Sequence, residues 1–555
     1  MAKSISWALI FLIPPLVHAA APSTKAVDQV FAQWNRPNSP GCALAVIKEG
    51  HIIYEHGYGM ANLELGVPIT PKSVFDIGSV SKQFTAMSTL LLMQDGKLSL
   101  DDDIRKYLPE MPDYGARITI RHLLYHTSGL RDYDDLFDLI GIPEADFTTA
   151  RDALQLVARQ KGLNFPTGQA YLYSDTGYFL LSEIIERLTG QTLREFAQQR
   201  IFGPLGMTST HFHDDHTMVV PQRATGYAPH ASGGFEVDMS NFEQVGDGSV
   251  MTTVEDLFKW DQNFYRPQVG GPQIIQLMTT PGALDNGKAT SYGIGLITER
   301  YRGLRWIHHG GEWVGYRAAS SLFPDQHFST LITCNCLGSI DPTRMATQVA
   351  DLYLAGVFND KTVRKHAVSS TNDDPTRYVG GYWSEQIGTF RRFDVREGKL
   401  RVYAPDSPRE LISFGNGEFE TNSEDSEHNT KYVFTRQGGS YELRSIEDGE
   451  QFSYKAVQVL DDNPKRLAEY AGEYTNEDLR TTWTLVVNNG KLIRQQWMNW
   501  DQELRPLFAD GFTGELSEGQ YMLHFNRDQN NRITGFDVAT DLVRPMRFHR
   551  TESIP

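Results

Sequence analysis

The sequence predicts an α/β domain, in which helices flank an antiparallel sheet, followed by two small antiparallel β-barrels. Three observations carry this prediction. Strand patterns lie at both ends of the first 358 residues, around a helical middle. Short strands of alternating apolar and polar residues fill the last third of the chain, and that last third repeats itself. At 555 residues the chain is too long for one ordinary domain.

The first 19 residues have the pattern of a signal peptide. Lys3 supplies a positive start, residues 7–17 are mostly apolar, and Val17 and Ala19 place small side chains at a cleavage site. The alternative, a membrane anchor, is disfavoured because the apolar run is short and contains Pro14. We expect an exported protein, periplasmic or secreted, with no membrane span after cleavage of this segment.

The second segment, residues 24–358, is predicted to be the α/β domain. A buried strand at 41–47 turns at Glu49-Gly50 into a second strand at 51–58, and three more strands follow near the end of the segment. Asp341-Pro342 then begins a helix, with aspartate as its N-cap. Strands from both ends are therefore expected to share one sheet. The predicted helices between them are 79–95, 119–126, 150–160, 176–189, 192–201 and 254–265, and the late strands are 305–309, 317–323 and 329–335.

The chain has three cysteines, Cys42, Cys334 and Cys336. Three residues cannot supply a disulfide framework. Cys334 and Cys336 alternate along one predicted strand and are expected to share a face as small apolar side chains. The stability of the protein is expected to come from its core.

Residues 359–377 are polar and have the composition of a linker. The two predicted barrels, lipocalin-like in size and strand pattern, occupy residues 378–460 and 467–552. Two markers of the first barrel recur 92 residues later. Tyr378–Tyr382 recurs as Tyr470–Tyr474, and Gly398–Leu400 recurs as Gly490–Leu492. One spacing for two markers indicates a duplicated domain.

The net charge of -17 argues against nucleic acid or an anionic membrane as a partner, because both require a basic surface. The proportions of hydrophobic (40%) and charged (22%) residues are those of a globular protein, which excludes disorder as the main state.

A candidate nucleophile lies at Ser79, at the junction between an extended segment and a helix. Positions i and i+3 share a helical face, so Lys82 can contact Ser79. A serine hydroxyl becomes a good nucleophile when a base takes its proton, and a desolvated lysine can be that base. The start of a helix adds backbone N–H donors for an oxyanion. By itself, Ser-x-x-Lys is a weak signal that also fits an N-cap serine beside a solvated lysine.

Further motifs accompany Ser79 and strengthen this interpretation. They are residues 118–130, 165–168, 171–178, Pro204–Met207, Gly246–Gly248, His309–Gly311 and Gly315. In this order and spacing, the chain from about residue 27 to 356 resembles the penicillin-recognising Ser-x-x-Lys hydrolases. This family includes class C β-lactamases, D-alanyl-D-alanine carboxypeptidases, related esterases and D-aminopeptidases. The resemblance implies a β-lactamase/transpeptidase-like catalytic domain.

The resemblance also implies a role for each matching residue. Ser79 would be the acylated nucleophile and Lys82 its base. Tyr173 would relay protons to the leaving group, and His309 and Gly311 would form the third motif on a strand beside the site. The oxyanion would lie between the backbone N–H groups of Ser79 and Glu312. No cofactor is expected.

Two departures from the family pattern bear on the substrate. Asp175 stands where the family usually has asparagine, so a residue that only accepts hydrogen bonds would lie beside Lys82 and favour its ammonium form. His309, mostly neutral at pH 7, stands where the lactamases have lysine, and Gly310 replaces a hydroxyl residue. Attraction for a substrate carboxylate is thereby lost, which favours a neutral ester or a cationic amine end.

The layout, with a His-x-Gly third motif and two terminal barrels, resembles that of the D-aminopeptidases. In those enzymes a loop of the last barrel reaches the active site, and residues 496–501 are a candidate here, although a barrel hairpin is the more ordinary interpretation. The expected function is removal of N-terminal D-residues from small peptides, amides or esters, which could derive from the cell wall. An esterase, a D,D-carboxypeptidase, a weak β-lactamase and a catalytically weak cell-wall peptide binder remain alternatives.

Two histidine groups are expected to lie outside the chemistry. His122 and His126 share a helical face and are expected to be structural. A histidine-rich stretch could suggest a metal site, but its spacing fits no helical zinc motif and a polar loop is expected there. That stretch contains His211, His213, Asp214, Asp215 and His216. The prediction is therefore that no metal binds.

Overall fold

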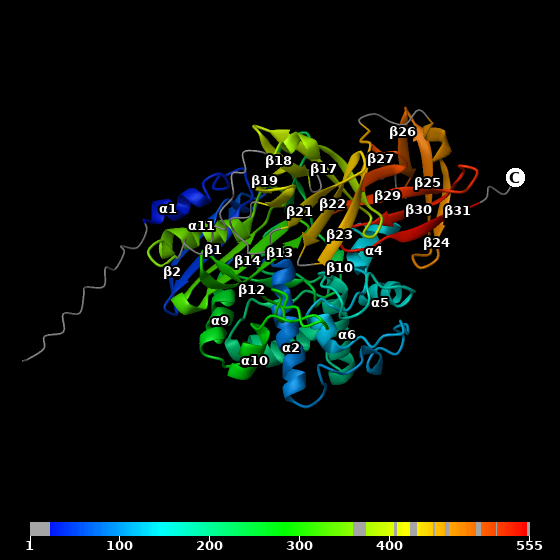
Figure 1. The fold of residues 1–555 in the computed structure, drawn as a ribbon. Helices are drawn as coiled ribbons and strands as arrows, with labels where there is room; N and C mark the ends of the chain where they lie inside the picture. Colours follow the sequence, from blue (N-terminus) through cyan, green and yellow to red (C-terminus); the bar gives the residue numbers. More distant parts are fainter. Residues whose placement is uncertain are drawn as a thin grey trace, which may run out of the picture.

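A computed structural model describes most of the chain (Figure 1). The described residues are 23–358, 373–403, 408–421, 430–447, 450–460, 466–495, 501–517 and 519–551. The predicted signal peptide and most of the predicted linker lie outside these ranges. Within the described residues, no helix is both long and apolar enough to cross a membrane.

The first domain is built on a six-stranded antiparallel sheet in the order β12-β13-β14-β15-β1-β2. Strand β1, from the start of the domain, pairs with β15, from its end, so the predicted joining of both ends in one sheet is confirmed. The strands are β12 (Ile297–Tyr301), β13 (Leu304–Trp313), β14 (Tyr316–Phe323), β15 (Phe328–Cys334), β1 (Cys42–Lys48) and β2 (His51–Tyr58).

Both faces of the central strands β1 and β15 are buried. Along β1, Leu44 and Val46 face a core that includes β15 and the last helix, whereas Ala43 and Ala45 face a larger core formed by the helical region. This alternation is the period of two that a strand imposes on its side chains. In Figure 1, α1 and α11 lie on one side of the sheet, and α2, α6, α9 and α10 lie on the other.

The predicted helices are present, most of them somewhat shorter than expected. The helices are α1 (Thr24–Val30), α2 (Lys82–Gln94), α3 (Ile120–Leu124), α4 (Tyr133–Ile140), α5 (Ala150–Ala158), α6 (Asp175–Thr189), α7 (Leu193–Ala197), α8 (Gly203–Leu205), α9 (Val254–Tyr265), α10 (Pro272–Met278) and α11 (Pro342–Leu354). The carboxylate of Asp341 accepts from the N–H of Arg344, as expected of an N-cap. Among the helices and the strands of the main sheet, the sequence interpretation missed α1, α4, α8, α10 and β12.

Short strands connect these elements. They are β3 (Met60–Asn62), β4 (Val67–Pro68), β5 (Phe75–Asp76), β6 (Phe147–Thr148), β7 (His211–Phe212), β8 (Tyr227–Pro229), β9 (Phe235–Val237), β10 (Asn241–Phe242) and β11 (Val250–Thr252). Among them, β5 pairs with β11 directly before the candidate nucleophile and therefore fixes the approach of the chain to that residue.

The expectation that Cys334 acts as a small apolar side chain is wrong. Cys42 on β1 lies opposite Cys334 on β15, and the two form a disulfide. Cys336 is a buried free thiol. The count of three excluded a framework but not a single bridge, and a sequence separation of 292 residues hid the pairing.

The two predicted barrels are confirmed as closed, antiparallel and eight-stranded, with neighbouring strands consecutive in sequence. The first comprises β16 (Gly380–Ser384), β17 (Thr389–Arg396), β18 (Lys399–Tyr403), β19 (Pro408–Gly415), β20 (Glu418–Thr421), β21 (Lys431–Gln437), β22 (Ser440–Glu447) and β23 (Glu450–Val457). The second comprises β24 (Gly472–Asn476), β25 (Thr481–Asn488), β26 (Lys491–Gln495), β27 (Gln502–Phe508), β28 (Gly511–Glu515), β29 (Gln520–Arg527), β30 (Ile533–Ala539) and β31 (Met546–Arg550).

The repeated sequence markers have the same structural job in each barrel. Tyr382 donates a hydrogen bond from its hydroxyl to the carbonyl of Tyr378, and Tyr474 donates in the same way to Tyr470. The other marker is a turn whose glycine has φ near +76° at both Gly398 and Gly490, a conformation that favours glycine. The duplication therefore preserves the parts that close and turn the barrel.

Candidate active site

Ser79 lies in a short 3-10 helix, η1 (Gly78–Ser81), which leads directly into α2. Asp76, at the end of β5, accepts from the N–H of Gly78 at 2.8 Å and so fixes the turn before the serine. Gly78 has a φ of +48°, and a Cβ there would lie 2.6 Å from the backbone nitrogen of Glu312. Only glycine allows this close approach.

Lys82 is fully buried beneath Ser79. Its Nζ lies 2.9 Å from Ser79 Oγ and donates to the carbonyl oxygen of Asp247 at 2.7 Å. A third contact is an ion pair with Asp175, the first residue of α6. The three contacts use all the donors of an ammonium group and hold the lysine against the serine.

Strand β13 forms one edge of the site. A Cβ at Gly311 would lie 1.9 Å from the carbonyl oxygen of Ile77, so a glycine is required for the strand to lie against the segment that precedes Ser79. The side chain of Glu312 forms an ion pair with Arg317. Ser79 and Glu312 both line the same cleft, as the predicted oxyanion pair requires.

Tyr173 and His309 belong to a buried aromatic cluster beside Lys82. The Nζ of Lys82 lies 4.8 Å from the ring centroid of Tyr173, and the ring of His126 packs on Tyr173 at 4.3 Å. His126 Nδ1 also accepts from the N–H of Ser174, so it positions the Tyr173 segment. Burial and, secondarily, Asp175 raise the pKa of Tyr173 well above its usual value. The phenol therefore stays protonated.

His309 is neutral. Burial, and then the charge of Lys82, lower its pKa to about 3. Its Nδ1 lies 2.6 Å from the carbonyl oxygen of Gly310 and its Nε2 lies 3.0 Å from the hydroxyl of Tyr292. These contacts fit a tautomer protonated at Nδ1, with Nε2 accepting from tyrosine.

The cleft above Ser79 encloses about 740 Å³ of open space and is strongly acidic. Its carboxylate residues are Asp132, Asp134, Asp135, Asp138, Glu144, Asp175, Asp247 and Glu312. Of the described residues that line it, none is lysine or arginine. Most of these carboxylates come from α4 or its flanks, the helix that the sequence interpretation missed.

Burial, aided by neighbouring carboxylates, raises the pKa values of several of these carboxyl groups, among them Asp132, Asp134 and Asp247. The pKa of Asp132 is about 7, raised by burial and then by Asp175, and that of Asp247 is about 6 for the same two reasons. Burial, and then Asp247, raise the pKa of Asp134 well above its usual value. Since burial disfavours the charged form of an acid, the empty cleft retains protons near neutral pH.

The second barrel borders this cleft through the β30–β31 connection, residues 540–545. Leu542 lines the cleft, and its carbonyl accepts from the side-chain amide of Asn164 at 2.8 Å. The hydroxyl of Thr540 donates to Asp135 on α4. The stretch 496–501, named from the sequence as a candidate for such a loop, lies outside the described residues except for Asp501.

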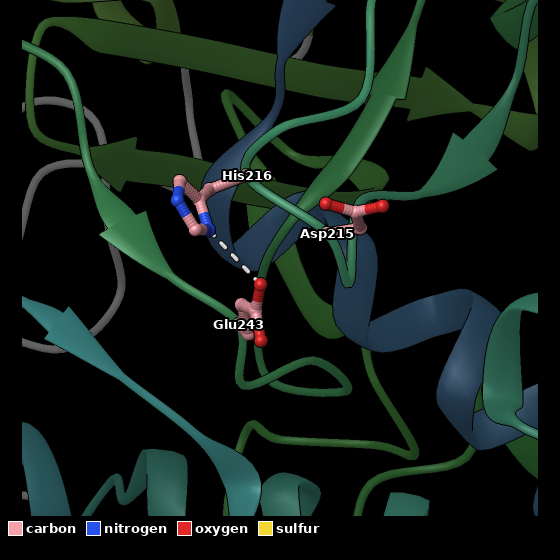
Figure 2. A group of neighbouring side chains, drawn as sticks. All are labelled: Asp215, His216 and Glu243. Atoms are coloured by element: carbon pink, nitrogen blue, oxygen red, sulfur yellow. Dashed lines mark hydrogen bonds and ion pairs between the residues drawn. The ribbon is translucent and has the colours of Figure 1, made fainter.

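The histidine-rich stretch is divided among separate contacts. His211 Nε2 lies 3.4 Å from His213 Nδ1. Asp214 forms an ion pair with Arg194. Figure 2 shows His216 directed at Glu243, with 2.9 Å between Nδ1 and Oε1, and Asp215 beside them. Asp215 instead accepts from the N–H of Thr217. The ligand atoms of Asp215, His216 and Glu243 lie within 4.8 Å of one another, but each carboxylate already has a protein partner.

Comparison with known proteins identifies the family of the chain. The Beta-lactamase family profile matches residues 27–355. A D-aminopeptidase of Brucella anthropi is 26% identical over 526 residues, which cover 92% of this chain and 96% of that protein. The octameric penicillin-binding protein homologue of Pyrococcus abyssi superposes with a TM-score of 0.55 at 22% identity, over 78% of this chain and 98% of that one. The D-amino acid amidase of Ochrobactrum anthropi SV3 has a TM-score of 0.50 at 24% identity, over 59% and 95%. With more than half of its length matched by the profile, the chain belongs to the beta-lactamase family of serine hydrolases.

Proposed function

We propose that the protein is a D-aminopeptidase, which releases N-terminal D-amino acids from peptides or amides through an acyl-enzyme on Ser79. One observation carries the choice within the family: the cleft beside Ser79 is lined by carboxylates, with no lysine or arginine among the described lining residues. Such a cleft attracts an ammonium group and repels a carboxylate. The name of the D-aminopeptidase relative, which spans nearly the whole chain, supports the same choice.

The geometry supports a separate catalytic role for each of these residues. Lys82, in the neutral amine form that a base requires, takes the proton of Ser79 as Oγ attacks the substrate carbonyl, and Asp175 stabilises the ammonium group that results. The N–H groups of Ser79 and Glu312 hold the oxyanion. Tyr173, kept protonated by burial, gives its proton to the departing amine when the C–N bond breaks. Water then hydrolyses the acyl ester.

The substrate α-ammonium group fits beside the carboxylates nearest Ser79. Asp175 contacts Lys82, and Asp132 accepts from the N–H of Asp175 at 2.5 Å. The Oδ1 atom of Asp247 is buried without a hydrogen-bond partner. A substrate ammonium group would give that atom the partner that a buried carboxylate requires. A β-lactam or a peptide ending in D-alanine would instead bring a carboxylate into this acidic cleft, and His309, being neutral, would not attract it.

We also propose that the protein is exported. The predicted signal peptide at residues 1–19 is one support for this. The Cys42–Cys334 disulfide is a second, because such bonds persist in oxidising compartments.

The test compares two neighbouring serines on a panel of substrates. Ser79→Ala should lower turnover of D-alanyl amide by at least about 1,000-fold. Ser81→Ala should keep most of the activity, because Ser81 Oγ accepts from the N–H of Val250 and is therefore engaged away from the lysine. The panel is D-alanyl amide, its N-acetylated and L forms, a D-alanyl-D-alanine peptide, a short ester and a β-lactam.

Mass spectrometry of the intact protein would locate the acyl group. Preference for D-alanyl amide over every other member of the panel is the expected result. Preference for the ester or the β-lactam would replace this proposal with an esterase or a lactamase. A protein that binds the panel without acylation of Ser79 would be the catalytically weak peptide binder.

A further inference from the structure

A second pocket lies beside Tyr173, and three parts of the molecule line it. Tyr173 and the two residues before it come from the catalytic domain. Asp541 and Arg544 come from the connection between β30 and β31, which also carries Leu542 to the acidic cleft. Most of the other lining residues, Thr389 among them, belong to the first barrel. The pocket encloses about 790 Å³ of open space, and the proposed reaction has so far used only Tyr173 from it.

The first barrel contributes residues from the inside of its wall. Side chains two residues apart on a strand share a face. Arg391 therefore shares the face of Phe393, and Glu450 shares that of Phe452, and both phenylalanines belong to the core of this barrel. Glu447 lies directly opposite Glu450 on the neighbouring strand and so has the same orientation. These charged residues stand at one end of the barrel, and the pocket is the mouth of the barrel at that end.

The mouth carries charges of both signs, and one pair is incompletely satisfied. Arg544 donates to Glu450 at 3.4 Å, and the exposed Asp541 lies in the same lining. By contrast, Nη2 of Arg391 lies 4.0 Å from Oε1 of Glu447, which is beyond hydrogen-bond distance. Among the described residues, neither Nε of Arg391 nor Oε1 of Glu447 has a hydrogen-bond partner, although both atoms are buried.

A buried donor and a buried acceptor without partners are costly to the folded protein. Arg391 and Glu447 line the same pocket, so one ligand that offers both an acceptor and a donor would satisfy both of them. A peptide group has this character, since its carbonyl accepts and its N–H donates. A mixed pocket of this kind therefore suits a peptide better than it suits a single ion.

Tyr173 connects the mouth of the barrel to the chemistry. The centroid of its ring lies 4.8 Å from Nζ of Lys82, which in turn lies 2.9 Å from Oγ of Ser79. Because Tyr173 gives its proton to the departing amine in the proposed reaction, the departing nitrogen must lie beside it. The acyl part of the substrate occupies the acidic cleft, so whatever follows the nitrogen extends toward the pocket that Tyr173 lines.

We propose that the mouth of the first barrel binds the leaving peptide, and that the preferred substrates are D-aminoacyl peptides rather than simple amides. A carbonyl or terminal carboxylate of the leaving peptide accepts from Arg391, and an N–H of it donates to Glu447. When the C–N bond breaks, the proton of Tyr173 passes to the nitrogen and the peptide departs with a free amine. This inference rests on the proposed D-aminopeptidase activity and names the substrate class of that same site.

The test compares three substrates that share a free N-terminal D-alanine and differ only in the leaving group. D-alanyl amide releases ammonia, D-alanyl-glycine releases glycine with its carboxylate, and D-alanyl-glycinamide releases a neutral amide. We expect kcat/KM to be about 10- to 100-fold higher for at least one dipeptide than for D-alanyl amide, the value of one or two hydrogen bonds to charged groups. A gain for D-alanyl-glycine alone would identify a carboxylate as the group at Arg391. A gain that D-alanyl-glycinamide shares would identify the carbonyl oxygen.

Arg391→Met should lower the dipeptide-to-amide ratio of kcat/KM several-fold. The intrinsic reactivity of each substrate cancels when this ratio is compared between variants. Thr389→Phe, which fills the mouth instead of removing its charge, should lower the same ratio and serves if Arg391→Met does not fold. Arg401→Met is the matched control, because it removes a cation from the same barrel, where Arg401 pairs with Asp394 at 2.6 Å outside the pocket lining. It should leave the ratio unchanged.

A fluorophosphonate that labels Ser79 in every variant would show that each site is folded. If D-alanyl amide is hydrolysed as well as both dipeptides, or if the ratio is the same in wild type, Arg391→Met and Thr389→Phe, the leaving-peptide site is overturned and the aminopeptidase activity stands. If none of the three substrates is hydrolysed although Ser79 is labelled, the proposed function fails, and this inference fails with it.

Discussion

The two barrels share a fold and a repeated sequence, yet they relate differently to the catalytic domain. The second barrel has its buried residues, among them Trp483 and Phe548, in one continuous cluster with the helical region of the catalytic domain. The first barrel has a core of its own, which includes Phe393 and Leu443. Duplication therefore provided two similar barrels, of which the second became part of the active-site wall.

The contact between the second barrel and the catalytic domain centres on α4. The indole N–H of Trp483 and the guanidinium of Arg494 both donate to the carbonyl of Leu139, at 2.8 and 2.7 Å. These bonds satisfy a carbonyl at the end of α4 that has no partner within the helix. The first barrel packs on the second, where Trp383 and Phe508 share a small apolar cluster, and its Glu447 and Phe452 line a pocket with Tyr173.

One connection distinguishes the two barrels most clearly. In the first barrel, β22 and β23 are joined by residues 448–449, whereas β30 and β31 in the second are joined by residues 540–545. The longer connection carries Thr540 to Asp135 and Leu542 to the cleft. A small difference in loop length thus gives one of two related barrels a position in the site.

Exchanging that connection should produce the largest effect. Replacing residues 540–545 with Asp448-Gly449 removes the wall at Leu542 and the hydroxyl that binds Asp135. We expect kcat/KM for D-alanyl amide to fall by about 10- to 100-fold, as for the loss of one or two hydrogen bonds to charged groups. The ratio of kcat/KM for D-alanyl amide to kcat/KM for its N-acetylated form should fall as well.

A fluorophosphonate label on Ser79 would show that the exchanged protein keeps its nucleophile. Substituting Asn-Gly for Asp448-Gly449 in the first barrel is the control and should change neither quantity. If the ratio between D-alanyl amide and its N-acetylated form does not change after the exchange, the second barrel does not take part in substrate recognition.

A second pair of variants separates stability from activity. Trp483→Ala and Phe393→Ala each delete a buried aromatic side chain and should each lower the free energy of unfolding by about 3–5 kcal/mol. Trp483→Ala should also raise KM for D-alanyl amide, because α4 loses a bond to Leu139. Phe393→Ala should leave the kinetics of the folded enzyme unchanged. Denaturant unfolding and steady-state kinetics at a temperature where both are folded provide the measurement, and equal kinetic effects would contradict the comparison.

The smallest expected effect is a change of kcat/KM with pH. It comes from carboxyl groups beside α4, the helix that the second barrel contacts. Only the ionised forms of Asp132 and Asp247 attract an ammonium group, and their pKa values are about 7 and about 6. For D-alanyl amide, kcat/KM should therefore rise several-fold from pH 5.5 to 7.5. It should fall again as the substrate amine loses its proton near pH 8. His309, with a pKa of about 3, does not titrate in this window. If kcat/KM for a neutral ester rises in the same way, the rise must come from the titration of another group.

Much of the fold could be predicted from the sequence. In α2, α6 and α9, apolar residues recur with helical spacing over several turns, because one face of each helix is buried within its own domain. Helix α4 was missed for a physical reason. It is short, and part of its covering comes from the second barrel, more than 300 residues away in sequence. Local patterns cannot report a contact between distant segments.

The same limit applies to the site. A spacing of three residues on a helical turn placed Ser79 beside Lys82, and the structure has them 2.9 Å apart. The acidic cleft could not be predicted, since Asp132 and Asp247 come from separate segments and only folding brings them together. The acidic run at 132–138 was the available signal, and it has the appearance of a solvated helix face when it is considered alone.

The disulfide closes most of the catalytic domain into one covalent ring. Cys42 and Cys334 join its first and last sheet strands, so the 292-residue span between them contains Ser79, α4 and His309 within one ring. During synthesis the bond cannot form until β15 has emerged, and at that stage neither barrel has yet been made. Oxidation therefore closes a ring around the catalytic residues that includes neither barrel, and a protein reduced after assembly would lose the closure of the ring while it kept both barrels.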